Sequence, residues 1–245
     1  MLQTTKAIIL RTTAYGDTSL IVSAYTERYG LQQYMVKGAR KSSKKGSSMS
    51  TMLQPAAIVE LVVYHNELKQ LQLVKELKWA VVYQQVMHSI HRNAVALYMI
   101  ELLTKTLRQP ETNEELYAFI EDSLCLLDQC DAAVVANLPL FFSLRLAAML
   151  GFRIDDDKPD GTCYLDLQAG SFDTEPPIHG MYLDAALSQV AFELMQQDNA
   201  VTLYRIKLNQ QQRRELLQGF IHFFQYHVAD FGRLKTVQVL QEVLG

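Results

Sequence analysis

The residues with the clearest chemical potential form a short run of cations. Five lysine and arginine side chains fall within nine residues: Lys37, Arg40, Lys41, Lys44 and Lys45. Gly46, Ser47 and Ser48 follow them and loosen the backbone. Such a loop can follow the phosphates of a nucleic acid, because each neutralised phosphate releases counterions. The spacing alone leaves two interpretations equally open, a nucleic-acid site and a solvated loop.

Four tyrosines lie near the same part of the chain, where their rings could stack on bases. They are Tyr15, Tyr25, Tyr29 and Tyr34. The alternative is that these rings are core or edge residues of the fold.

Other motifs do not assemble into a catalytic or metal site. His88 and His91 have ligand spacing, but a metal site needs at least three protein ligands. The acidic run at 155–157 fails as a calcium loop, because Lys158 and Leu167 stand where carboxylates are required. Neither a phosphate-binding glycine loop nor a nucleophile elbow is present in the sequence. We therefore expect no enzyme activity, no bound metal and no cofactor.

Arg145 lies among apolar neighbours and is a candidate partner-binding residue. A cation beside an apolar pocket suits a peptide that ends in a carboxylate. Phe141 and Phe142, with Phe220, Phe223 and Phe224, could frame such a groove, although aromatic residues in this pattern are more often core. An internal salt bridge explains Arg145 equally well.

Five short strands are predicted in the first 80 residues. The β-branched and apolar runs lie at 6–11, 20–25, 31–37, 57–64 and 68–75. A long polar segment, 38–54, separates the third strand from the fourth. This is the layout of an OB-fold, a small Greek-key barrel, and an SH3-like barrel also fits.

After Trp79 the apolar period becomes helical, which predicts a second, mainly helical domain. A first helix is expected around Val82 to Leu103, and two capping boxes, Thr112 with Glu115 and Asn209 with Gln212, are expected to open later helices. The 19 mostly apolar residues at 132–150 match a membrane span in length. Arg145 and Pro139 near their middle favour a buried helix that begins near Leu138 and ends at Gly151.

The fold class predicted is therefore α+β, with an OB-fold domain at 1–80 and a helical domain at 81–245. Glycines, prolines and aspartates interrupt the helical pattern at 151–182, which indicates an irregular insertion. Three cysteines and the absence of a signal-peptide pattern favour a reducing cytoplasm.

Charge separates the two predicted domains. Residues 1–80 hold 11 of the 23 basic and 5 of the 26 acidic side chains, a net charge of +6, and the remainder carries −9. The formal charge of −3 therefore conceals a basic barrel and an acidic helical body.

With these residues in view, the sequence resembles the RecO family of bacterial recombinational DNA repair proteins. The resemblance rests on AIILR (7–11), YGD (15–17), TERYG (26–30), KGAR (37–40) and QP (54–55). Later segments match more loosely: FSLRL (142–146), LGF (150–152) and KTVQVL (235–240).

The resemblance implies an OB-fold on a helical domain and a non-enzymatic mediator in the cytoplasm, at the nucleoid. Such a protein binds single- and double-stranded DNA and anneals complementary strands. It contacts the C-terminal tail of the single-stranded DNA-binding protein SSB and acts with RecR to load RecA. The DNA contacts implied are Arg11, Arg28, Lys37, Arg40, Lys41, Lys44 and Lys45.

One departure concerns zinc. Some members of the family carry a four-cysteine zinc module after the LGF segment, whereas the irregular segment here has only Cys163, with His179 as the nearest other soft ligand. Because a structural zinc needs four ligands, we expect none. The alternative to a DNA mediator is a helical adaptor whose basic loop binds acidic protein partners.

Overall fold

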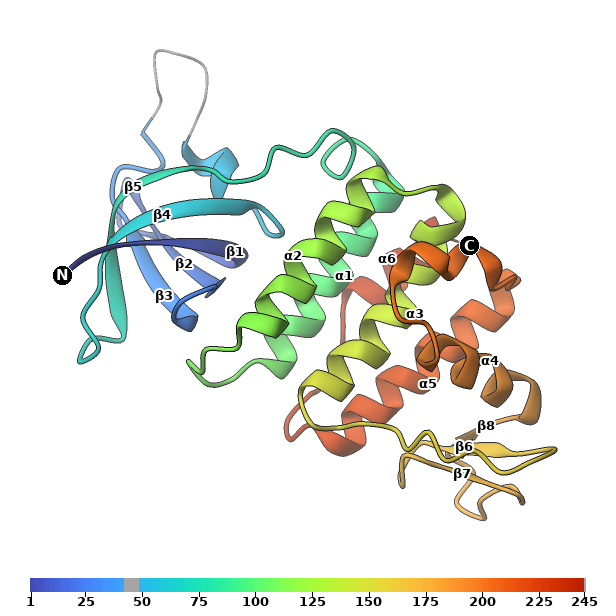
Figure 1. Cartoon of the computed structure of the whole chain (residues 1–245). Helices are drawn as coiled ribbons and strands as arrows, with labels where there is room; N and C mark the ends of the chain where they lie inside the picture. Colours follow the sequence, from blue (N-terminus) through green and yellow to red (C-terminus); the bar gives the residue numbers. More distant parts are fainter. Residues whose placement is uncertain (42–48, 245) are drawn as a thin grey trace. The chain divides into compact units, whose positions relative to one another are not determined.

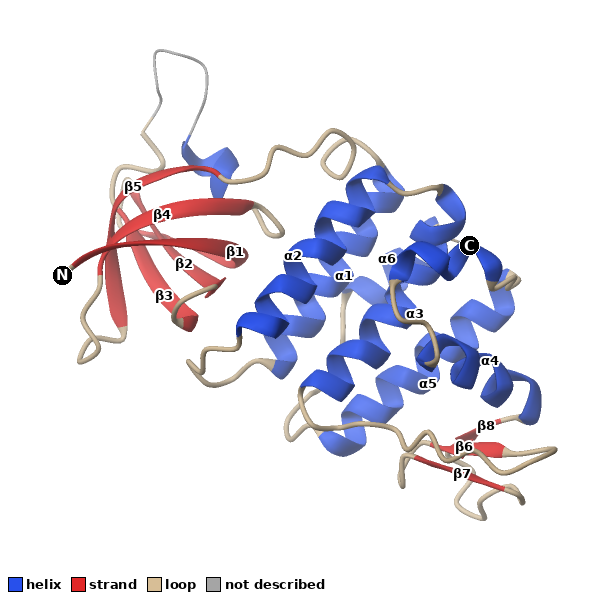
Figure 2. Cartoon of the chain, viewed as in Figure 1, coloured by secondary structure: helices blue, strands red, loops and turns tan. Residues whose placement is uncertain are grey.

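The first part of the chain folds into a closed five-stranded barrel (Figures 1 and 2). The structure, a computed structural model, describes residues 1–41 and 49–244. The strands are Leu2–Tyr15 (β1), Ser19–Thr26 (β2), Gly30–Val36 (β3), Ile58–Tyr64 (β4) and Leu71–Trp79 (β5). Their order around the barrel is β1-β2-β3-β5-β4, and a 3₁₀ turn, η1 (Met49–Leu53), precedes β4. The expected five-stranded barrel is confirmed.

Alternating side chains fill the inside of the barrel. Ala7, Ile9, Val22, Tyr34 and Val59 are all buried there. Burial of each large apolar side chain stabilises the fold by roughly 1.5–3 kcal/mol. The interior is therefore a packed core, as in other small barrels.

The chain divides into two compact units. One holds Met1–Gln84 with Leu103–Cys125, and the other holds Gln85–Leu102 with Leu126–Gly245. Within the first unit, the Tyr25 ring stacks on the Tyr117 ring with centroids 6.3 Å apart. A stretch of helix is thus part of the same unit as the barrel.

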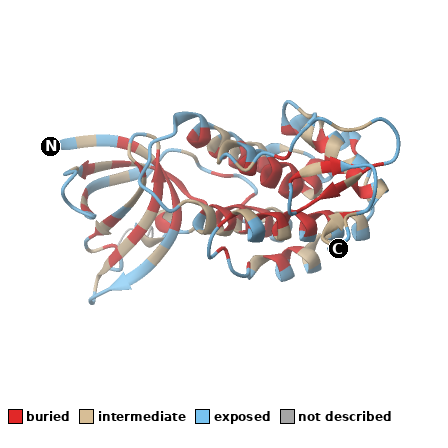
Figure 3. Cartoon of the chain, turned by 90° about the horizontal axis from the view of Figure 1, so that it is seen from below, coloured by how far each residue is buried: buried red, intermediate tan, exposed pale blue. Residues whose placement is uncertain are grey.

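Six helices follow the barrel in the described part of the chain. They are Ile90–Thr106 (α1), Glu114–Gln129 (α2), Ala132–Met149 (α3), Ala185–Met195 (α4), Gln210–His227 (α5) and Thr236–Val243 (α6). A 3₁₀ segment, η2 (Ala200–Arg205), lies between α4 and α5. Figure 3 colours their buried faces red.

Helix α3 is the core helix of the second unit. Among the described residues it alone is long and apolar enough to cross a membrane, but 67% of that window is buried inside the protein. Asn137, which is buried, donates its amide hydrogens to the carbonyls of Leu203 in η2 and of Ile206 directly after it. Burial of this extent is typical of a helix in the core of a folded domain.

The helix starts differ from the sequence expectations in three places. Val82 and Val86 precede the first helix, because the backbone N–H groups of Gln85 and Val86 both donate to the Asp128 carboxylate at 2.8 Å. The cap of α2 is Asn113, whose side chain accepts the Leu116 N–H at 2.9 Å. Helix α3 begins at Ala132, whereas the sequence predicts a start near Leu138, and Pro139 therefore lies inside the helix.

The capping box of Asn209 and Gln212 is confirmed at the start of α5. The Asn209 side chain accepts the Gln212 N–H, and the Gln212 side chain accepts the Asn209 N–H. Two of the free N–H groups at the helix start are thereby satisfied.

The irregular segment contains a small antiparallel sheet, ordered β7-β6-β8. Its strands are Tyr164–Asp166 (β6), Ser171–Asp173 (β7) and Tyr182–Leu183 (β8). The His179 Nε2 atom lies 2.9 Å from an Asp166 oxygen, and the Met181 N–H donates to His179 Nδ1. Because Nδ1 is an acceptor, Nε2–H donates to the carboxylate. This pair joins β6 to the chain that leads into β8.

Burial opposes ionisation of the Asp166 carboxyl, but its other contacts outweigh burial. The N–H groups of Ala169 and Gln168 donate to it, and so does His179. The net effect lowers the pKa of Asp166. The carboxylate therefore acts as an anionic anchor for the turn that follows β6.

Candidate nucleic-acid interface

The outer surface of β1, β2, β3 and β5 carries two aligned rows of side chains. In the first row Arg11 pairs with Ser23, Ser23 with Gln33, and Gln33 with Leu71. In the second row Thr13 of β1 pairs with Ile21 of β2, Ile21 pairs with Met35 of β3, and Met35 pairs with Leu73 of β5. All eight side chains are exposed or half-buried, whereas Val22, Tyr34 and Gln72 between the rows are buried. These eight residues define the barrel face.

A bulge in β1 directs Arg11 outward. Ile9 pairs with Ala24 inside the barrel, but Arg11 pairs with Ser23, so the register shifts by one residue at Leu10. Simple alternation from the buried Ile9 would point Arg11 into the core. The extra residue reverses that direction, and a bulge beside a functional surface often re-aims a side chain in this way.

Three of the sequence-predicted cations, Lys37, Arg40 and Lys41, lie at the end of the barrel where β1 turns into β2, and Arg11 lies midway along the barrel. Arg11, Lys37, Arg40 and Lys41 are all exposed, and none forms an ion pair with a described residue. Lys37 directly follows β3, and Arg40 donates from its N–H to the Thr18 carbonyl at 3.0 Å. The Arg40 guanidinium also donates to the Gly16 carbonyl at 3.2 Å. Arg40 therefore ties the turn after β3 to the turn after β1 and presents its charge there.

Arg28 lies at the opposite end of the barrel from Lys37, Arg40 and Lys41. It belongs to the turn between β2 and β3, and its N–H donates to the Thr5 hydroxyl at 3.4 Å. The structure therefore does not bring Arg28 into the same group. Lys44 and Lys45 lie outside the described residues.

Two of the four candidate stacking tyrosines are core residues. Tyr25 and Tyr34 are 1% and 0% exposed, and burial raises the pKa of Tyr25 to about 12. Tyr15, at the end of β1, is 53% exposed. Tyr29 is half-buried and stacks on His65 with the ring centroids 3.8 Å apart. Only Tyr15 and Tyr29 therefore keep ring surface near solvent.

No group of three or more metal-ligating side chains occurs in the described residues. His88 and His91 are both exposed, and Cys163 is buried as a free thiol. Arg153 pairs with Asp156 on the acidic run after α3.

Arg145 projects from α3 into a surface pocket of the second unit. The pocket has a volume of about 410 Å³ and is lined by Arg145, Met149, Arg153, Ile154 and Met195 together with neighbouring residues. Phe141 and Phe142 are 3% and 0% exposed and do not line it. The Arg145 guanidinium lies 6.0 Å from the Phe141 ring centroid. Phe141 thus packs beneath Arg145 as a core residue.

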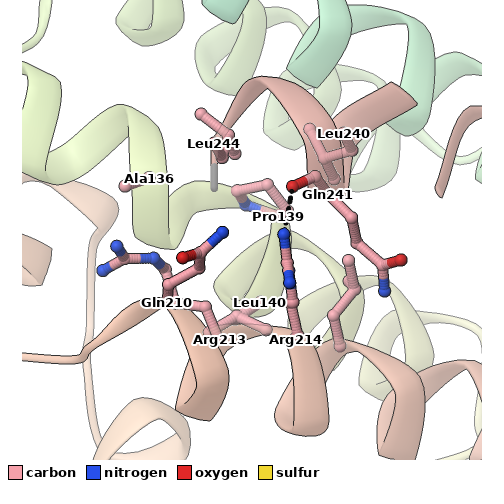
Figure 4. A pocket seen from close by; sticks show the side chains of 10 residues that line it. Ala136, Pro139, Leu140, Gln210, Arg213, Arg214, Leu240, Gln241 and Leu244 are labelled. Carbon is pink, nitrogen blue, oxygen red and sulfur yellow. Dashed lines mark hydrogen bonds between the residues drawn. The ribbon is translucent and has the colours of Figure 1, made fainter. Parts of the chain in front are cut away.

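A second, much smaller pocket of about 30 Å³ also combines arginine with apolar side chains (Figure 4). Arg213 and Arg214 of α5 border Pro139, Leu140 and Leu240. Arg213 donates to the Leu208 carbonyl at 2.7 Å, and Arg214 donates to the Gln241 carbonyl at 3.0 Å. The Nε atoms of both guanidinium groups are buried and have no hydrogen-bond partner among the described residues. The sequence pattern did not single out this pocket, because α6 and α5 meet there only in the fold.

The barrel order, the long connection before β4 and the helical second unit together define an OB-fold protein with a helical C-terminal region. Two family models match the chain: "Recombination protein O N terminal" at residues 1–83 and "Recombination protein O C terminal" at 87–236. The chain belongs to the RecO family of DNA repair proteins.

Curated relatives match along essentially their whole length. The DNA repair protein RecO of Christiangramia forsetii is 32% identical over 249 residues, with 100% of each chain covered. That of Bacteroides fragilis strain ATCC 25285 is 30% identical over 244 residues, with 99% of each chain covered. That of Phocaeicola vulgatus is 28% identical over 245 residues, again with 100% of each covered.

Proposed function

We propose that the protein binds DNA on the barrel face and acts as a recombination mediator in DNA repair. The observation that carries this proposal is a set of four exposed cations that form no ion pair with any described residue: Arg11 lies on the barrel face itself, and Lys37, Arg40 and Lys41 lie at one end of it. The rest of the face is polar or apolar. Phosphates bind to such cations, and bases can lie against the neutral side chains.

The mediator role is annealing of complementary single strands and, with RecR, assistance in loading RecA onto SSB-coated DNA. Its support is the family and the name "DNA repair protein RecO" of the relatives. The protein would bind both single- and double-stranded DNA in the cytoplasm, at the nucleoid. It would act by binding alone, without a catalytic group or a cofactor.

A salt titration tests the barrel face. If about five phosphates are engaged on a single strand, the slope of log K against log salt is roughly −3.5. The double variant Arg11→Ala/Lys37→Ala should make the slope shallower by about 1.4, since each lost contact removes about 0.7. Lys78→Ala is the matched control, because Lys78 is already paired with Glu60 at 2.8 Å. Equal slopes for the double variant and the wild type would contradict the barrel face as the site.

A second variant tests the loop. Replacement of Lys41, Lys44 and Lys45 by Glu should abolish binding of a labelled oligonucleotide, while thermal unfolding stays that of the wild type. Unchanged affinity at low salt would refute the assignment of these lysines.

The SSB C-terminal tail is the proposed ligand of the Arg145 pocket. Arg145 borders a hollow lined by apolar side chains such as Leu144, Met149 and Ile154, which suits an acidic peptide with an apolar end. Arg153, on the same hollow, is already paired with Asp156. Arg145→Ala should weaken binding of a labelled tail peptide at least tenfold, whereas Arg213→Ala tests the pocket beside α6 as the alternative site. If the chain binds acidic peptides tightly and DNA not at all, the adaptor interpretation replaces the mediator.

A further inference from the structure

The second row of the barrel face continues past β5 onto β4 and the start of β1. Leu73 of β5 pairs with Tyr64 of β4, and Tyr64 pairs with Leu2 of β1. Tyr64 is 49% exposed and Leu2 is 45% exposed. Directly paired residues place their side chains on the same side of a sheet. The extended row therefore crosses all five strands on the outside of the barrel, in the order Thr13, Ile21, Met35, Leu73, Tyr64 and Leu2.

Tyr64 is the one aromatic residue among these six, and the barrel fixes its backbone. On one side, Val63 is buried and pairs with the buried Val74. On the other side, the buried Gln72 side chain accepts the Asn66 N–H at 3.0 Å and so braces the hairpin that follows β4. The ring is therefore presented from a backbone that is ordered before any ligand arrives, which lowers the entropy cost of binding.

The far end of the extended row lies beside the cations of the proposed DNA site. Met35 lies two residues before Lys37, and Thr13 lies two residues after Arg11. The strand order gives four steps from β1 to β4. At ~4.8 Å between neighbouring strands, four steps cover roughly 19 Å. About six nucleotides at ~3.4 Å each span that distance, which lies within the range of about 4–16 nucleotides that an OB-fold binds.

The charge around Tyr64 favours a neutral contact over an ionic one. Glu67 and Lys69 are both exposed on the hairpin that follows, and Lys75 is paired with Glu76 at 3.1 Å. A phosphate gains little there, because the positive and negative charges balance. A base is neutral, and its flat ring can stack on an aromatic side chain. A strand whose phosphates bind the cations would therefore contact Tyr64 through a base.

We propose that Tyr64 is a base-stacking residue for a single DNA strand that lies along the extended row. The proposal rests on DNA binding by the barrel face and adds a specific base contact on β4. Stacking on Tyr64 needs an unpaired base, because the bases of a duplex are already stacked on one another. Tyr64 therefore gives this surface a preference for single strands over duplex DNA.

Binding of a short oligothymidylate at fixed salt tests the stacking residue. Tyr64→Ala should weaken binding at least about fivefold, whereas Tyr64→Phe keeps a ring and should bind like the wild type. The slope of log K against log salt should stay unchanged in Tyr64→Ala, because no phosphate contact is lost. Affinity for a duplex should also stay that of the wild type. Tyr226→Ala is the matched control, since Tyr226 is 47% exposed but belongs to the other unit.

A tryptophan in place of Tyr64 gives a direct signal of stacking. A base stacked on tryptophan quenches its fluorescence, and the chain has a single tryptophan of its own, Trp79, whose signal the wild type supplies for subtraction. Oligothymidylate should quench Tyr64→Trp clearly more strongly than Tyr226→Trp. Because Tyr64 is exposed, a thermal melt of each variant should give the unfolding temperature of the wild type.

The outcomes separate the stacking residue from the site on which it depends. The stacking is wrong, and DNA binding by the barrel face stands, if Tyr64→Ala binds the single strand as tightly as the wild type. An equal loss of affinity for single strand and duplex, or equal quenching of the two tryptophan variants, also overturns it. If the wild-type protein binds no oligonucleotide, the barrel face and the stacking residue both fail.

Discussion

Lys6 of β1 and Glu121 of α2 form an ion pair within the first compact unit. The Lys6 ammonium lies 2.9 and 3.1 Å from the two carboxylate oxygens of Glu121. Their side chains are 43% and 17% exposed, so solvent screens the pair only in part. The pair links the barrel to a helical stretch that is far away in the sequence.

This pair predicts a change in the titration of Lys6. The hydrogen bond that Lys6 donates to Glu121 raises the pKa of Lys6 above 10.5. Its contribution to stability is therefore present below the unfolded value and is lost as the pH rises through the raised folded value. Glu121→Gln should move the pKa of Lys6, followed by NMR of the side chain, back toward 10.5. Glu193→Gln should leave it unchanged, because Glu193 belongs to the other compact unit.

Gly30, at the start of β3, should tolerate no side chain. Its φ is +58°, and a Cβ atom there would lie 2.1 Å from the Glu111 carbonyl oxygen. Gly16 has nearly the same φ, +57°, but open space around it. Gly16→Ala should cost about 1–2 kcal/mol from backbone strain alone, and Gly30→Ala should cost clearly more. Equal costs in denaturant unfolding would contradict the close approach.

Asn113 and Thr112 provide a paired test of the cap of α2. Asn113→Ala should lower the free energy of unfolding by about 0.5–2 kcal/mol, because the Leu116 N–H loses its acceptor. Thr112→Ala should change it little. A larger loss for Thr112→Ala in chemical denaturation would restore the cap predicted from the sequence.

Asp166 should make stability depend on pH on the acid side. Its folded pKa lies below 3.8, so its contribution is present above that value and is lost as the pH falls through the lowered one. Asp166→Asn should therefore reduce the difference in melting temperature between pH 6 and pH 3, since about half of an ordinary aspartate is protonated near pH 4. Asp173→Asn, on the exposed edge of β7, should preserve that difference.

Several features followed from local sequence because their causes are local. Each of the five strands is a short segment in which apolar residues alternate with polar ones or follow one another. The capping box of α5 joins Asn209 to Gln212, only three residues away. The concentration of cations after β3 is likewise visible in the printed sequence. A family resemblance based on these segments was confirmed along the chain.

Contacts between distant residues determined the rest. The first helix starts late because Asp128 binds the backbone before it, and Tyr25 and Tyr34 are core residues because of barrel closure. Above all, alternation predicts Arg11 inside the barrel, and the bulge at Leu10 turns it outward. The sequence by itself determined the residue types and the order of the elements, whereas strand register, which depends on both partners, decided which side chains form a common face.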